Sequence, residues 1–287
     1  MKRMILTGAL ALVAGVSILM AQAKAPAPKS KEELAAVQAL FTATRSGPDA
    51  TIKAAEDLVT KFADTDFKDV ALLSEAQAWQ QKRDAGKAQI YAERSLEANP
   101  KNFQTTLLLA ELLAQSTREN DLDKEEKLGK SEKYANDTIQ LVKEAVKPNP
   151  QLPDQQWEEA KRDLTAESHN ALGLAALVRK KYDVAAAEFK TAADGTSSPE
   201  PTFLVREASA LQLEGKNDEA IAICDKIMAD QQVLPQIRQV SQAIRATAIK
   251  AGGKNTTVPV APAAPAAPAA PAAPAAPAPP PPAEKKQ

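Results

Sequence analysis

The sequence predicts an all-α protein built as an array of helix-turn-helix repeats, an α-solenoid. Apolar residues recur at the spacing of an amphipathic helix, and no stretch alternates apolar and polar residues over the length of a strand. Similar patterns of small and apolar residues return about every 34 positions, which is a period of helical repeats. Aromatic residues make up only 4% of the chain and alanine is abundant, as expected for helices that pack closely.

The first 23 residues are expected to be a cleaved signal peptide. Lys2 and Arg3 precede an apolar run from Met4 to Met20, and Ala21-Gln22-Ala23 has the small-x-small pattern of a cleavage site. Ala23-Lys24-Ala25 has the same pattern, so cleavage after Ala23 and cleavage after Ala25 both stay open. The run is short for a membrane span of about 20 residues. We therefore expect an exported protein that stays in the periplasm or cell envelope or is secreted, with membrane contact only if the segment is not cleaved.

The opposite end, residues 253–287, is expected to be a disordered Ala/Pro-rich tail. Proline recurs at every third position from Pro259 to Pro277, which is the period of a polyproline II helix. Such a segment cannot bury a core. It is interpreted either as a solubilising tail or as a spacer that reaches through an envelope layer.

A short linker, residues 24–29, is followed by an expected helical hairpin over residues 30–68. Ser30-Lys31-Glu32-Glu33 has the pattern of a capping box, in which the Ser30 hydroxyl accepts a backbone N–H and the Glu33 side chain reaches back. Ser46-Gly47-Pro48-Asp49 then interrupts the apolar pattern, which predicts the turn before a second helix.

Four helix pairs are expected next, over residues 69–235. Their ranges are 69–102, 103–148, 166–199 and 201–234. The second pair carries a charged insertion from Ser116 to Gly129, whose acid–base pairs at (i, i+4) spacing predict that it lengthens the second helix of that pair. The alternative is that the insertion is a contact arm for a partner.

A last helix, residues 236–252, is expected to cap the array with a polar outer face, as the ends of repeat arrays require. Its expected buried stripe consists of Leu234, Ile237, Val240 and Ile244.

The repeat resembles the tetratricopeptide repeat (TPR) over roughly residues 69–235. In that family a small residue midway along the first helix meets a small residue early in the second helix. The best match is the unit 166–199, and the unit 69–102 departs from the pattern by lacking an aromatic residue near Ala85 and Ala92. The repeat-packing positions are Ala76, Ala88, Gly173, Tyr182, Ala185, Phe189, Ala208 and Ala220.

The resemblance implies an extended concave face, lined by the first helix of each unit, that binds a protein or peptide. Carried over residue by residue, the candidate peptide-binding positions are Gln77, Gln81, Glu111, Gln115, Asn170, Arg206 and Gln212, with Leu73, Leu174 and Ser209 beside them. A lining of amides and apolar groups suits an extended or helical peptide. One subset of the family clamps a C-terminal carboxylate with Lys, Asn and Arg. Leu73 and Val205 stand where polar clamp residues would be, which disfavours recognition of a free C-terminus.

Catalysis and nucleic-acid binding are disfavoured by counts of residues. His169 is the one histidine and Cys224 the one cysteine, so neither a histidine-rich metal site nor an intrachain disulfide can form, and both residues are expected to be structural. No glycine-rich phosphate loop is present. Lys and Arg number 36 against 37 Asp and Glu, so there is no basic excess for phosphate groups. No enzyme activity, cofactor, metal ion or nucleic-acid partner is therefore expected.

These observations favour a non-enzymatic scaffold of the cell envelope that binds a protein or peptide on the concave face. The alternative is a structural spacer or tether. In that case the Ala/Pro-rich tail spans or anchors, and the helical body is a passive module.

Overall fold

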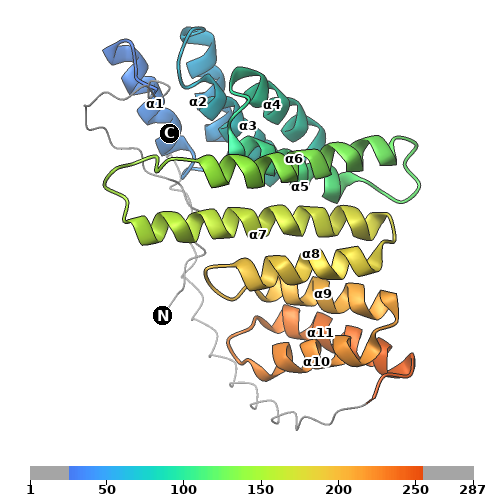
Figure 1. Ribbon diagram of the computed structural model, residues 1–287. Helices are drawn as coiled ribbons and strands as arrows, with labels where there is room; N and C mark the ends of the chain where they lie inside the picture. Colours follow the sequence, from blue (N-terminus) through green and yellow to red (C-terminus); the bar gives the residue numbers. More distant parts are fainter. Residues whose placement is uncertain (1–25, 255–287) are drawn as a thin grey trace, which may run out of the picture.

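The computed structural model describes residues 26–254, and all regular secondary structure in that range is helical (Figure 1). This confirms the predicted all-α repeat architecture. The predicted signal peptide and most of the predicted tail lie outside the described residues. In chain order the helices are α1 (Lys31–Ala43), α2 (Pro48–Lys61), α3 (Lys68–Gln81), α4 (Ala85–Ala98), α5 (Phe103–Ser116), α6 (Lys124–Glu144), α7 (Asp154–Val178), α8 (Tyr182–Gly195), α9 (Pro201–Glu214), α10 (Asn217–Ala229) and α11 (Pro235–Lys250).

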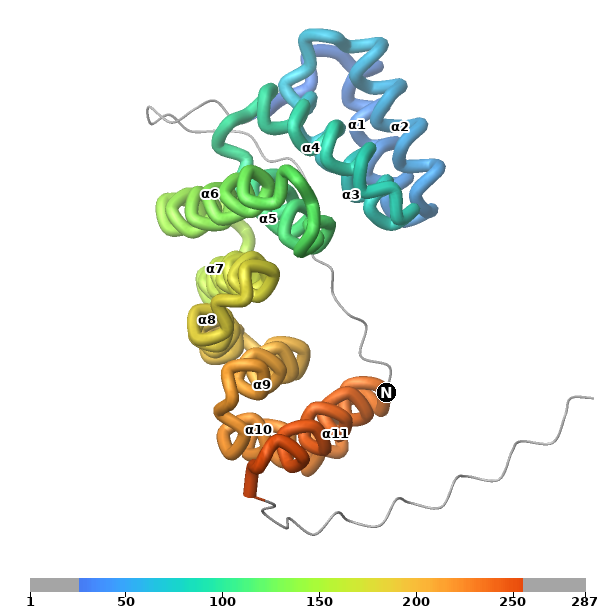
Figure 2. Tube along the Cα trace, turned by 90° about the vertical axis from the view of Figure 1, so that its right-hand side faces the viewer, coloured from blue at the N-terminus to red at the C-terminus, as the bar shows by residue number. Residues whose placement is uncertain are grey.

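Each helix packs on the next one along the chain, so the helices form a continuous stack. The stack follows an arc in Figure 2, where α5, α7, α9 and α11 lie on the side of the enclosed space. Helices α6, α8 and α10 lie on the outer side of the arc. The first helices of successive pairs therefore line the inner face, as expected for a helical solenoid.

Small side chains occupy the places where paired helices approach each other. Ala76, Ala88, Ala208 and Ala220 are fully buried at these positions. Gly173 in α7 packs directly under the ring of Phe189 in α8, and a Cβ added to Gly173 would lie 2.6 Å from Phe189 Cε1. The close approach of α7 and α8 therefore requires glycine at this position. Of the remaining predicted packing residues, Ala185 is fully buried and Tyr182 is half-buried.

The turn between the two helices repeats one backbone geometry in three of the pairs. Arg83, Lys180 and Gly215 each adopt a positive φ, of 61°, 60° and 92°. After each of them a backbone N–H closes the turn onto the carbonyl five residues earlier, from Asp84 to Trp79, from Lys181 to Ala176 and from Lys216 to Leu211. This is the Schellman type of helix end, which usually holds glycine at the left-handed position.

The charged insertion lengthens α6, as the ion-pair spacing predicts. Helix α6 has 21 residues, and its first turns carry the ion pairs Asp123–Lys127 at 3.0 Å and Glu126–Lys130 at 2.7 Å. Helix α7 has 25 residues and runs without a break into the third pair. The two longest helices therefore lie side by side in the middle of the stack (Figure 1).

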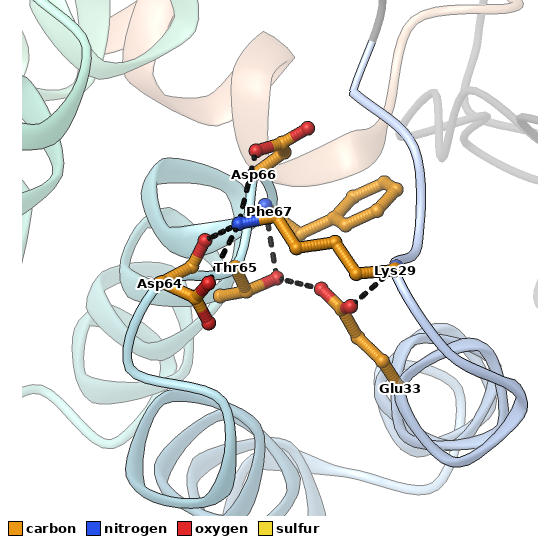
Figure 3. Close-up of polar contacts among 6 residues, drawn as sticks. All are labelled: Lys29, Glu33, Asp64, Thr65, Asp66 and Phe67. Atoms are coloured by element: carbon orange, nitrogen blue, oxygen red, sulfur yellow. Dashed lines mark hydrogen bonds and ion pairs between the residues drawn. The ribbon is translucent and has the colours of Figure 1, made fainter.

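A buried carboxylate holds the N-terminal segment to the α2–α3 turn (Figure 3). The Ser30 hydroxyl accepts the Glu33 N–H at 3.0 Å, as predicted. The Glu33 carboxylate reaches one residue further back than predicted, because it accepts the Lys29 N–H at 2.6 Å. Its other oxygen accepts the Thr65 hydroxyl at 2.6 Å, and Lys29 also pairs with Asp64 at 3.0 Å. The capping residue of α1 thus joins the first helix to the start of α3.

The prediction for the buried face of the last helix was wrong in part. Leu234 and Val240 are 60% and 49% exposed, whereas Ile237 and Ile244 are half-buried on the face of α11 that buries Ser241 and Ala248. The small side chains of Ser241 and Ala248 let α11 approach α9 and α10 closely on this face. Arg245 fixes this orientation, since its Nε donates to the Asp225 carboxylate of α10 at 2.6 Å.

Candidate functional site

Three of the predicted groove residues form one polar cluster on the inner side of the arc, in which Asn170 and Arg206 are hydrogen-bonded and Glu111 acts on Arg206 through its charge. Glu111 comes from α5, Asn170 from α7 and Arg206 from α9, the first helices of three successive pairs. The Arg206 guanidinium donates to the Asn170 side-chain oxygen. The Asn170 side-chain N–H donates to Glu167 at 3.2 Å. The stacking of the pairs thus assembles side chains that are far apart in sequence.

Asn170 holds the centre of this cluster. It is 2% exposed, and it lies one helical turn before Gly173, where α7 is packed tightly against α8. Both ends of its amide are used, because the oxygen accepts from Arg206 and the nitrogen donates to Glu167. Its orientation is therefore fixed by packing on one side and by two hydrogen bonds on the other.

Sequence reasoning missed Glu167, the fourth member of the cluster. It precedes Asn170 by three residues, so the two side chains share one face of α7. The sequence holds a signal for it, because Glu167, Asn170 and Leu174 have the (i, i+3, i+7) spacing of a single helix face.

The carboxyl group of Glu111 lies in an environment that disfavours its charge. The group is largely enclosed by protein although the residue as a whole keeps some exposure, and no hydrogen bond or ion pair within residues 26–254 engages it. Burial, and then the negative charge of Glu167, raise the pKa of Glu111 to about 7, against a smaller opposing effect of Arg206. Burial also raises the pKa of Glu167 and lowers the pKa of Arg206.

Two further carboxylates lie close enough to act electrostatically on the cluster. Glu200 caps α9 by accepting the Thr202 N–H at 3.0 Å, and Asp163 accepts the Ser197 N–H at 2.7 Å. Both hold the connection between α8 and α9, and both raise the pKa of Glu167 through their charge. The surroundings of Arg206 therefore carry more negative than positive charge.

The other predicted groove residues do not join this cluster. Gln77, Gln81 and Gln115 are exposed, and Gln212 is half-buried. Within the described part of the chain, no polar contact connects any of them to Glu111, Glu167 or Arg206.

The single histidine and the single cysteine have structural surroundings. His169 Nδ1 lies 2.8 Å from a carboxylate oxygen of Glu188, which joins α7 to α8. Cys224 is fully buried, and burial raises the pKa of its thiol to about 11. Among residues 26–254 no group of side chains is arranged to hold a metal ion, and none of the helices there has the length and apolar character needed to cross a membrane.

An open pocket of about 440 Å³ lies at the ends of α3 and α4, away from the inner polar cluster. Its lining includes Asp66, Lys68, Asp69, Arg94 and Glu97. Acidic and basic side chains are mixed there, so the pocket shows no preference for a ligand of one charge.

No protein-family model and no curated protein sequence matches the chain. Among solved structures, it is similar to a thermophilic TPR protein of Thermus thermophilus, with a TM-score of 0.51. The match covers 74% of this chain and 98% of that one at 16% sequence identity. The chain has a TPR-like fold. At this level of identity the likeness concerns the fold alone, and it agrees with the family resemblance seen in the repeat-packing residues of this TPR-like array.

Proposed function

We propose that the chain is a non-enzymatic scaffold whose concave face binds a segment of a partner protein. The observation that carries this proposal is the inner polar cluster of Glu111, Glu167, Asn170 and Arg206, to which three successive helix pairs contribute. Small side chains such as Ala76, Gly173 and Ala208, with buried hydroxyl groups between α5 and α6, close the helix pairs without these charged groups. Partly buried charges cost free energy unless a partner compensates them.

The inner face suits an extended or helical segment. Exposed amides flank the cluster, with Gln77 on α3 and Gln115 on α5. Amide side chains donate to and accept from a peptide backbone, while a continuous surface along α3, α5, α7 and α9 gives the segment length to contact.

The surroundings of the two most reactive residue types favour a role without catalysis. His169 is engaged with Glu188, and the thiol of Cys224 is held in its neutral form by burial. Neither side chain makes a polar contact with the inner polar cluster within the described residues.

We further propose that binding takes place outside the cytoplasm, in the cell envelope, on the basis of the signal-peptide pattern of residues 1–23. Cell fractionation of the full chain and of a variant without residues 258–287 tests this location. Loss of envelope localisation with binding intact would instead favour a tether function for the tail.

Site-specific photo-crosslinking tests the groove. A photoreactive residue replaces Gln77, Gln115 or Gln212 in the full chain, and matched controls replace Lys133 of α6 or Lys190 of α8, both exposed on outer helices. We expect the same partner to be crosslinked from the inner positions and not from the controls. Equal labelling from both sets, or none from the inner set, would contradict a binding function for the concave face.

A further inference from the structure

We infer that the inner polar cluster is a subsite for one cationic group of the bound segment, a lysine ammonium or an arginine guanidinium. This inference rests on the proposed function and specifies the chemistry of the segment. It follows from the balance of charges around Arg206 and from the unpartnered carboxylate of Glu111.

Charged groups from α5, α7 and α9 surround the subsite. Glu111 projects from α5, Asp163 and Glu167 from α7, and Glu200 stands at the start of α9. Arg206 is the one cation that acts on this group in the described range. A ligand cation would therefore meet a net attraction, and a ligand anion a net repulsion.

The hydrogen bonds leave acceptor sites on the carboxylates open to a ligand. Arg206 donates one of its five N–H groups to the Asn170 oxygen and makes no ion pair with another described residue. Asn170 donates to one oxygen of Glu167, and Glu111 receives no hydrogen bond from residues 26–254. A cation that reached Glu111 and Glu167 together would donate hydrogen bonds to both carboxylates.

Two other ligand chemistries fit the cluster less well. A ligand carboxylate near Arg206 would be repelled by the charges of Glu111, Glu167 and Glu200, which all act on Arg206. A metal ion would need a closer set of ligands, because no group of three or more histidine, cysteine or acidic side chains in the described range is arranged to hold one.

The test starts from random dodecapeptides displayed against the full chain. We expect selected sequences to share a lysine or arginine at one position. A fluorescent peptide of the most frequent sequence, and a matched peptide with norleucine in place of that cation, are then compared by fluorescence anisotropy. Norleucine keeps the length of the lysine side chain without its charge. We expect it to weaken binding about tenfold, which is within the range measured for charge pairs at interfaces.

Variants of the chain connect this loss to the subsite. The double variant Glu111→Gln, Glu167→Gln should bind both peptides with equal affinity, because the glutamines keep the shape and remove the charge. Gln77→Ala, a control on the inner face outside the cluster, should keep the tenfold preference. Thermal unfolding of each variant checks that the fold is intact.

The dependence on pH gives a second readout. The cationic peptide should bind more tightly as the pH rises from 5.5 to 8, since Glu111 has a pKa of about 7 and becomes ionised over this range. The norleucine peptide should not follow this trend.

The outcomes separate the subsite from the groove. Selected peptides that bind the inner face but share no cation would overturn the subsite and leave the groove in place. A preference for the cationic peptide that persists in the double variant would do the same. Selection of acidic peptides that depend on Arg206 would also overturn it. If substitutions on the inner face weakened the binding of no selected peptide, both proposals would be contradicted.

Discussion

The neighbouring helix pairs α5–α6 and α7–α8 are closed by different chemistry. In α7–α8 the glycine at position 173 packs against the Phe189 ring, with Ala185 buried beside it. In α5–α6 the seam is held by hydroxyl groups: Ser131 donates to the Ala110 carbonyl at 2.8 Å, and the Thr138 and Thr106 hydroxyls lie 2.8 Å apart. The same fold unit therefore tolerates either an aromatic–glycine contact or a buried polar seam.

The difference extends beyond the two pairs. From α7 to α11 one apolar cluster runs through alanines, Phe189 and Ile221. At the junction of α5, α6 and α7 the buried apolar cluster consists of Ala110, Ala135 and Ala171. Leu128 and Val142 of α6 are buried as well, and the hydroxyl groups, which require one geometry, add to the register of this long helix.

The largest expected effect is that of Gly173→Ala in α7. The new methyl group would overlap the Phe189 ring, so we expect the free energy of unfolding in urea to fall by about 3 kcal/mol, at the upper end of the range for overpacked cores. The matched control is Gly129→Ala in α6, where an added Cβ meets nothing within 4 Å and should stabilise by about 0.5–1 kcal/mol. Equal effects of the two substitutions would show that the aromatic–glycine contact does not close α7–α8.

The second largest effect is expected for Glu111→Gln in α5, which tests whether burial of the Glu111 charge destabilises the fold. The pKa of Glu111 is about 7 in the folded chain against an ordinary value of 4.5. A raised carboxyl pKa means that stability from this site is greatest below pH 4.5 and is lost as the pH rises through 7. At about 1.4 kcal/mol per pKa unit, and with allowance for residual solvent contact, the substitution should stabilise by about 2 kcal/mol at pH 8.

The gain from Glu111→Gln should fall to about a quarter of its pH 8 value at pH 5, as followed by urea unfolding at both pH values. Glu144→Gln, an exposed position at the end of α6, is the control and should show little dependence on pH. A gain of the same size at pH 5 and pH 8 would contradict the burial of the Glu111 charge.

A smaller effect is expected in the polar seam of α5–α6. Ser131→Ala and Thr138→Val each remove a buried hydroxyl and should lower the unfolding free energy by about 1 kcal/mol. Thr191→Val in α8 is the control, because the Thr191 hydroxyl is exposed and bonds within its own helix. If the seam variants matched the control, hydroxyl groups would not be what closes this pair.

The smallest expected effect concerns the turn of α7–α8. Lys180 has a φ of 60°, a conformation that favours glycine, so Lys180→Gly should stabilise by about 0.5–1 kcal/mol. Loss of its exposed ion pair with Glu119 subtracts little. The converse change, Gly215→Ala in the α9–α10 turn, should destabilise by a similar amount. Thermal unfolding of the two variants should shift in opposite directions.

Sequence patterns were sufficient for the helices and for the seams with small residues. Gly173, Phe189 and the buried alanines follow from a fixed spacing along the chain, and local spacing is what a sequence shows directly. The extension of α6 could also be predicted from the sequence, because the ion pairs Asp123–Lys127 and Glu126–Lys130 form within one helix.

Features that depend on contacts between distant segments could not be predicted from the sequence. Of the predicted apolar stripe of α11, Ile237 and Ile244 are half-buried but Leu234 and Val240 are exposed, because close packing at Ser241 and Ala248 decides which face is buried. Glu33 has its expected place in the cap, whereas its bond to Thr65 requires the α2–α3 turn to lie beside it. Glu167 and Asn170 share one face of α7, whereas Arg206 reaches Asn170 from another helix, 36 residues further along the chain, which no local spacing predicts.

The two ends of the helical body are each held by a carboxylate: Glu33 at the start, and Asp218 at the end, where it accepts the Lys254 N–H at 2.7 Å. These contacts stand where the segments 1–25 and 255–287 continue the chain. A mechanical load transmitted through either segment would reach the body at α1 or α11. Short, directional hydrogen bonds at the ends would then be loaded first, and they break after a small extension. The apolar cores between them would be strained only after these bonds had broken.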